Sequence, residues 1–184
     1  MVLEYVAGKP LSEVLDAADG TDGEALGGLG AEVGRVLAGI ATVTFGRPGF
    51  FADAKLAVGE MLPWSEQLPG TDANPKNVLV SRAGGGWRVD AVLDWEFSFS
   101  GCPYADFANM TRFAGAYPAG FVAGFRAGFG EGQRADLARP DDWAYLGRVM
   151  DMFALSDLVT RPDGHPVADQ AAAEIRRWIA DGIS

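Results

Sequence analysis

Residues 71–80 read TDANPKNVLV, and a second apolar stretch ends in VLDW at residues 92–95. Residues 77–81 and 87–95 are rich in β-branched and aromatic side chains, which predicts two strands. Residues 83–86 between them read AGGG, a sequence suited to a tight turn. We therefore expect an antiparallel hairpin, and the rest of the fold is interpreted around it.

A tight turn brings the two outer ends of a hairpin together. Asn77 opens the first strand and Asp94 closes the second, so we expect them to be neighbours. Asp72 lies on the preceding loop, which Pro75 stiffens. Two carboxylates and an amide oxygen suit a hard cation such as Mg²⁺. If Asn77 and Asp94 bind the metal, Asp72 is free to orient or deprotonate a hydroxyl. The alternative is a turn Asp, a strand-end Asn and a capping Asp that never meet.

Helical patterns occupy most of the remaining sequence. A short strand is expected at residues 2–6, closed by a turn at 7–10. The expected helices are residues 12–18, 24–43, 105–114, 119–129, 141–159 and 167–181. The residues expected to face inward on the last two are Trp143, Leu146, Met150 and Phe153, then Ile175, Trp178 and Ile179. The expected fold class is α+β: a single domain, residues 1–184, with a mainly helical body and one small hairpin.

Composition limits the classes of function. The chain has 184 residues, is 48% hydrophobic and carries a net charge of −10. This charge argues against nucleic-acid and anionic-membrane partners. Cys102 is the single cysteine, and no signal peptide or membrane span is recognisable, so a cytoplasmic location is expected.

Two linked motifs resemble the aminoglycoside phosphotransferase family, whose members have a protein-kinase-like fold. They are D-x-N-P-K-N-V-L-V, from Asp72, and V-L-D-W-E-F-S-F-S-G-x-P-x-x-D, which ends at Asp106. The resemblance implies that Asp72 is the catalytic base, that Asn77 and Asp94 bind Mg²⁺, and that Asp106 braces the catalytic loop. Residues 4–11, EYVAGKPL, resemble the segment between the two lobes. It follows that residues 1–10 are the hinge, where the backbone of Glu4, Tyr5 and Val6 would hold the adenine of ATP.

The sequence departs from the family pattern in four places. Gly70 stands where a histidine usually begins the catalytic loop, and Ala73 stands where a large apolar residue is common. Residues 52–70 lack the usual long helix, and no glycine-rich strand pair with a phosphate-binding lysine precedes the hinge. We therefore expect the C-terminal lobe of a truncated family member, with the N-terminal lobe absent.

The expected function is transfer of phosphate from ATP, with Mg²⁺, to a hydroxyl of a small molecule. Two alternatives stay open: a catalytically inactive remnant or small-molecule-binding module of the same fold, and a helical interaction domain with a structural hairpin. Residues 11–24 carry five acids and no base, which suits an amine-bearing substrate or simply a solvated helix face. An exposed inter-lobe face around residues 2–6 also predicts possible self-association.

Overall fold

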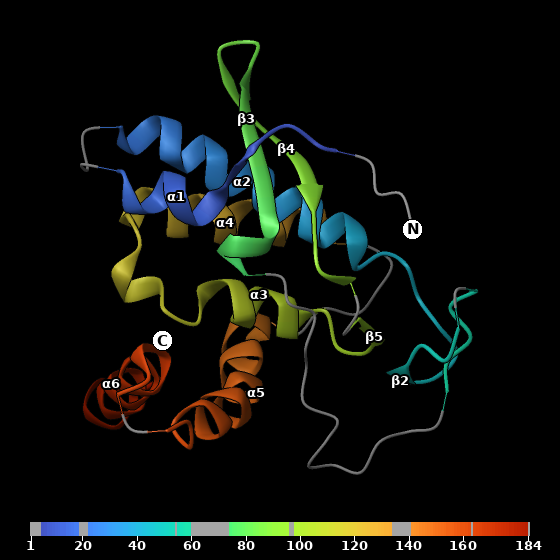
Figure 1. Cartoon of the computed structure of the whole chain (residues 1–184), viewed down its shortest axis with the longest axis vertical. Helices are drawn as coiled ribbons and strands as arrows, with labels where there is room; N and C mark the ends of the chain where they lie inside the picture. The colour runs from blue at the N-terminus through green and yellow to red at the C-terminus, as the bar shows by residue number, and fades with distance from the viewer. Residues whose placement is uncertain are drawn as a thin grey trace. The chain divides into compact units, whose positions relative to one another are not determined.

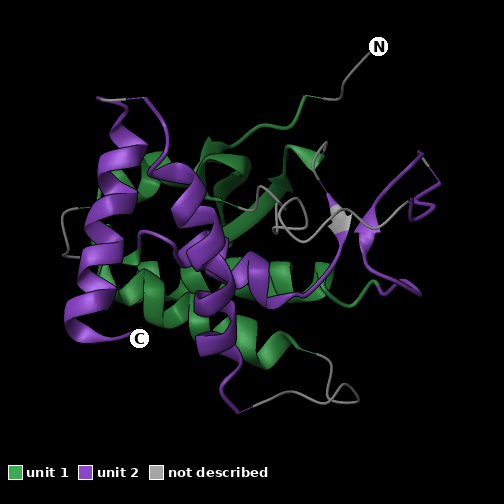
Figure 2. Ribbon diagram, turned by 90° about the horizontal axis from the view of Figure 1, so that it is seen from below, with its two compact units in different colours: residues 1–43, 72–96, 114–134 green, residues 44–71, 97–113, 135–184 purple. Residues whose placement is uncertain are grey.

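The computed structural model describes residues 5–18, 22–53, 55–59, 74–95, 98–133, 141–162 and 164–183 (Figure 1). Helices predominate and strands are short, as the α+β expectation requires. The chain divides into two compact units, coloured separately in Figure 2. Unit 1 contains residues 1–43, 72–96 and 114–134, and unit 2 contains residues 44–71, 97–113 and 135–184. No helix in the described part of the chain is long and apolar enough to cross a membrane.

The described residues of unit 1 contain helices, short 3₁₀ turns and a sheet. Its helices are α1 (Leu11–Asp16), α2 (Gly23–Ile40) and α4 (Ala119–Gly132), and its 3₁₀ turns are η1 (Pro75–Asn77) and η3 (Ala114–Ala116). The apolar residues of α2 recur at helical spacing and are buried: Leu26, Leu29, Val33 and Leu37. On α4, Phe121, Phe125 and Phe129 are fully buried at the same spacing. These two apolar faces form the core of the unit.

Glycines allow the backbones of α2 and α4, the blue and tan helices of Figure 1, to come into contact. A Cβ atom on Gly124 would overlap the carbonyl oxygen of Gly27, and one on Gly128 would overlap that of Ala31. In the other direction, a Cβ on Gly30 would overlap the carbonyl of Phe121. The glycines that weaken each helix in isolation are therefore what permits this packing.

The sheet of unit 1 contains the predicted hairpin. Strands β3 (Val78–Ala83) and β4 (Gly86–Val92) pair antiparallel, and β1 (Lys9–Pro10) adds to the free edge of β3. Gly84 and Gly85 form the turn with φ values of 59° and 84°, the left-handed conformation that two-residue hairpin turns favour. A bulge between Leu79 and Val80 shifts the register opposite Asp90.

The described residues of unit 2 form three helices and a small second sheet. The helices are α3 (Tyr104–Thr111), α5 (Trp143–Leu158) and α6 (Pro166–Asp181). Strands β2 (Gly49–Phe50) and β5 (Phe99–Ser100) pair antiparallel. Phe107 meets Trp143 edge to face with ring centroids 4.7 Å apart, which joins α3 to α5. Gly147 sits directly against the carbonyl of Tyr104, so a glycine again sets the helix separation.

Charged side chains take part in the core of unit 2. Arg148 and Asp151 are 4% and 2% exposed on the inner face of α5. Asp151 pairs with Arg112 (Nη2 to Oδ1, 2.6 Å), and Arg148 pairs with Glu174 of α6 (Nη2 to Oε1, 2.6 Å). These buried charges are tolerated because each has a partner.

Several expectations about local structure were wrong. The N-terminal strand lies at Lys9–Pro10, where a turn was expected, and Tyr5 and Val6 are outside any strand. Phe153, expected inside, is 47% exposed, because the inner face of α5 is rotated to include Arg148 and Asp151. Ile179 on α6 is 80% exposed, whereas its neighbour Trp178 is buried. Hydrophobic periodicity alone does not identify Arg148 and Asp151 as buried residues of α5.

Candidate functional site

The segment before the hairpin is a short, well-bonded turn. Asn74 caps η1 by accepting a hydrogen bond at Oδ1 from the backbone N–H of Lys76, over 2.9 Å. The N–H of Asn77 donates to the carbonyl of Asn74 at 3.0 Å. Pro75 is buried at the first position of the turn. This arrangement fixes the backbone at the point where Asn77 enters β3.

Asn77 and Asp94 lie together, as the antiparallel hairpin predicts. The Asn77 Nδ2 donates to Asp94 Oδ2 at 3.3 Å, and the Leu93 N–H donates to the Asn77 carbonyl at 2.7 Å. Val78 and Val92 are the last pair of the ladder, so Asn77 and Asp94 lie just beyond its end. The carboxylate is exposed, so the open end of the hairpin presents oxygen atoms to solvent.

The backbone of Asp94 is in an uncommon conformation. Its φ is 65°, and within the described part of the chain Leu56 is the other non-glycine residue with positive φ. The left-handed conformation is disfavoured for side chains with a Cβ, and such residues concentrate at functional sites. Immediately after it, Trp95 donates from Nε1 to the carbonyl of Val92 at 2.7 Å. That hydrogen bond ties the turn after β4 back to the strand.

The donor set fits a lightly held divalent cation. In the described ranges, no group of three or more His, Cys, Asp or Glu side chains is close enough to form a metal cage. Asp94 supplies a carboxylate, and rotation of the Asn77 amide would turn its Oδ1 toward the same point. Mg²⁺ commonly takes one or two protein oxygens and fills its shell with water and phosphate.

Asp106 is buried on α3, in unit 2. It is 8% exposed, and its Oδ1 has no hydrogen-bond partner among the described residues. Burial raises the pKa of its carboxyl to about 7. A buried carboxyl in this state can serve as a structural hydrogen-bonding group, and its role as a brace stays a prediction.

The remaining predicted site residues are less informative. Glu4 and Asp72 lie outside the described residues. Tyr5 is 88% exposed, and Val6 is partly buried. Their backbone role in binding adenine therefore stays a prediction.

One feature near the site escaped the sequence analysis. Asp90 occupies the β4 bulge, where its side chain is 5% exposed and accepts a hydrogen bond from Arg88 Nε at 2.8 Å. The spacing Arg88-x-Asp90 on one strand face is the sequence signal that could have identified this pair. The bulge itself left no sequence signal.

Comparison with known protein families gives a match to part of the chain. Residues 71–143 match the model of the phosphotransferase enzyme family. No curated protein and no solved structure matches the chain. The matched residues include the sequence positions of Asp72, Asn77, Asp94 and Asp106. The family resemblance predicted from the sequence is thus confirmed over residues 71–143, the part of the chain that this family model matches.

Proposed function

We propose that this protein is a phosphotransferase that moves the terminal phosphate of ATP to a hydroxyl group of a small molecule. The observation that supports this most is the 3.3 Å contact between Asn77 and Asp94, inside a segment that matches a phosphotransferase family. An amide and a carboxylate that converge at a solvent-exposed hairpin end suit Mg²⁺, the metal that accompanies ATP in such reactions.

The residues take separate roles in this proposal. Asp94, held with φ at 65°, and Asn77 bind the metal. When bound, Mg²⁺ neutralises charge on the phosphates and helps to align them. Asp72 accepts the proton of the attacking hydroxyl as the general base. The backbone of Glu4, Tyr5 and Val6 holds the adenine, and Asp106 keeps the bracing role that the family resemblance implies.

An amine-bearing acceptor is the proposed substrate class. The chain has a net charge of −10, which raises the local concentration of small cations. Glu13 and Asp16 on α1 and Glu24 on α2 are exposed acids from the stretch expected to attract such a substrate.

Metal binding tests the proposed ligands. Mn²⁺ added to ¹⁵N-labelled protein should broaden the side-chain amide signal of Asn77 and the backbone signals of Leu93 and Asp94. The Asp94→Asn variant should lose this broadening. Asp157→Asn, which alters an exposed carboxylate on α5, should retain it. Equal broadening in all three proteins would exclude Asn77 and Asp94 as a metal site.

Calorimetry with Mg-ATP, combined with an assay of released phosphate, tests the reaction class. Binding with slow hydrolysis that disappears in Asp72→Ala, while Mg-ATP affinity is retained, supports the transferase. Binding without turnover in the unaltered chain identifies the alternative, a non-catalytic binding module of the same fold. If the Asp72→Ala variant hydrolyses ATP as fast as the unaltered chain, the proposed base is wrong.

A further inference from the structure

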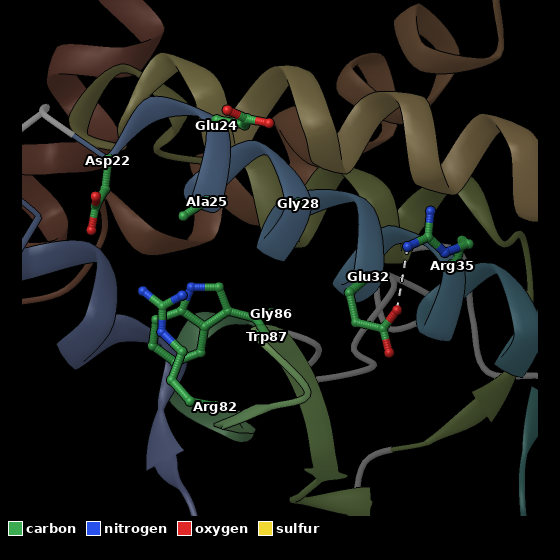
Figure 3. A pocket seen from close by; sticks show the side chains of 10 residues that line it. Asp22, Glu24, Ala25, Gly28, Glu32, Arg35, Arg82, Gly86 and Trp87 are labelled. Atoms are coloured by element: carbon green, nitrogen blue, oxygen red, sulfur yellow. Dashed lines mark hydrogen bonds and ion pairs between the residues drawn. The ribbon is translucent and has the colours of Figure 1, made fainter.

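A cavity lies at the turn end of the hairpin, within unit 1. It has a volume of about 590 Å³, inside the range typical of small-molecule sites. One wall is the first half of α2, from Asp22 to Glu32, and the other is the hairpin turn, from Arg82 to Trp87 (Figure 3). Asn77 precedes Arg82 by five strand residues, which places this cavity roughly 17 Å along the hairpin from the Asn77–Asp94 end.

The hairpin wall carries two hydrogen-bond donors without acceptors. Arg82 and Trp87 are direct cross-strand partners, and the guanidinium carbon lies 4.0 Å from the centroid of the indole ring. The structure records no ion pair for Arg82 among the described residues, and Trp87 Nε1 is buried with no hydrogen-bond partner. A buried N–H without an acceptor is costly, so a ligand oxygen that reaches it stabilises the protein.

The helix wall has the opposite charge. Asp22 is the N-cap residue of α2, but its side chain makes no capping hydrogen bond. Figure 3 shows the Asp22 carboxylate on the side of α2 that faces Arg82, whereas the Glu24 carboxylate points to the far side. Glu32, also on this wall, is paired with Arg35 at 3.3 Å. The carboxylate that stays available to a ligand is therefore that of Asp22.

We propose that this cavity binds a small zwitterion of the α-amino-acid type. The carboxylate of the ligand would accept hydrogen bonds from Arg82 and from Trp87 Nε1, once the guanidinium shifts off the indole ring. The ammonium group would lie against Asp22. A ligand with one charge satisfies only one wall and is repelled by the other, so the arrangement favours a molecule that carries both charges. This site does not depend on the proposed phosphotransferase chemistry.

Binding can be followed at the indole itself. In ¹H–¹⁵N spectra of the full chain, L-phenylalanine or L-alanine should shift the Nε1–H signal of Trp87, assigned through Trp87→Phe. Phenethylamine and 3-phenylpropanoate carry the ammonium and the carboxylate separately on the same ring. Each should bind at least about tenfold more weakly than L-phenylalanine. If neither amino acid shifts the Trp87 signal at millimolar concentration, or if the single-charge compounds bind equally well, the proposal is wrong.

Matched variants separate the two walls by calorimetry with L-phenylalanine. Arg82→Met keeps the aliphatic stem, and Asp22→Asn keeps the shape of the side chain; each should weaken binding about tenfold. Trp87→Phe keeps a ring but removes the N–H, and should weaken binding several-fold. Arg88→Gln, on the same hairpin but outside the cavity, should leave affinity unchanged. Equal losses in the Arg82 and Arg88 variants would show a general charge effect and would overturn the assignment.

Discussion

A glycine sets a close helix approach in both units, but the two units differ in the other contacts that hold their helices together. In unit 1, α2 and α4 touch through glycine backbones, with three phenylalanine rings filling the space beside the contact. In unit 2, α5 joins α3 and α6 through buried arginines and carboxylates. The α2–α4 interface has no room for an added atom. The ion pairs of α5 leave a buried charge without a partner if either member is removed. The two units should therefore respond to different kinds of substitution.

Directional hydrogen bonds account for the sensitivity expected in unit 2. Glu174 Oε1 accepts from Arg148 at 2.6 Å, from Arg177 at 2.7 Å and from Trp178 Nε1 at 2.7 Å. Arg148 also donates from Nη1 to the Thr111 carbonyl at 2.9 Å, which links α5 to the end of α3. One carboxylate thus satisfies donors from two helices, and its removal leaves all of them short of an acceptor.

The largest effect is expected from Glu174→Ala. The change leaves Arg148 buried without its partner, which should lower the free energy of unfolding by about 3–5 kcal/mol. Urea unfolding followed by circular dichroism measures this loss. The control is Asp157→Ala, which removes an exposed pair with Arg161 (Nη2 to Oδ2, 3.7 Å) and should cost less than about 1 kcal/mol. Similar losses in the two variants would mean that the buried network does not hold α5 and α6 together.

Gly124→Ala should have the next largest effect, in unit 1. The new Cβ overlaps the Gly27 carbonyl, so the helices must separate, at a cost of about 3 kcal/mol. Gly39→Ala is the matched control, because a Cβ there has no neighbour within 4 Å. That change should instead raise stability by about 0.5–1 kcal/mol through helix propensity. Thermal unfolding of both variants distinguishes contact from propensity, since a propensity effect alone would stabilise both proteins.

The glycines and the hairpin show how far the sequence predicts this fold. Residues 83–86 predicted the tight turn, and antiparallel pairing then placed Asn77 beside Asp94, as the 3.3 Å contact confirms. Helix propensity alone counts the glycines inside α2 and α4 as destabilising. The glycines of α4, Gly120, Gly124 and Gly128, are spaced by four, and this spacing indicates a contact face only once the partner helix α2 is known. Helix propensity is a property of a single helix, whereas the close packing of α2 and α4 depends on both helices.

Polar residues in the core account for the errors in unit 2. Hydrophobic periodicity placed Phe153 inside α5, but the inner face carries Arg148 and Asp151 instead. Their partners, Arg112 and Glu174, lie 39 and 26 residues away, so no local pattern identifies them. The positive φ of Asp94 was also beyond prediction, since aspartate rarely requires that conformation. Long-range pairing and backbone strain are set by the folded structure.

A third prediction contrasts two buried carboxyls in unit 2. Burial acts to raise the pKa of Glu174, but hydrogen bonds from Arg177, Arg148 and Trp178 outweigh it, so the pKa is lowered. Asp106 has no such compensation, and burial raises its pKa from 3.8 to about 7. Folded Asp106 therefore keeps a proton that the unfolded chain has already lost. Stability from this group is complete below about pH 3.8 and is lost as pH rises toward 7.

As the pH rises from 5 to 6.5, the titration of Asp106 should lower the free energy of unfolding by about 2 kcal/mol. Asp106→Asn removes the titration, so the difference between the unaltered chain and the variant should change with pH by this amount. Urea unfolding at several pH values measures it. Asp157→Asn, at an exposed site, serves as the control and should preserve the pH dependence. A parallel pH profile for Asp106→Asn would contradict a neutral, buried carboxyl.

The smallest effect concerns a single exposed hydrogen bond at the start of α6. His165 is the N-cap residue, and its Nδ1 accepts from the Val167 N–H at 3.3 Å. In unit 1, α1 begins after Pro10 with no side-chain cap, so the two helices offer a direct comparison. His165→Ala should lower stability by about 0.5–1 kcal/mol and speed amide exchange at Val167. His165→Asn supplies another acceptor and should restore protection. If the Val167 amide exchanges at the same rate in both variants, the start of α6 is held by the contacts of Glu174 and Trp178 rather than by its N-cap.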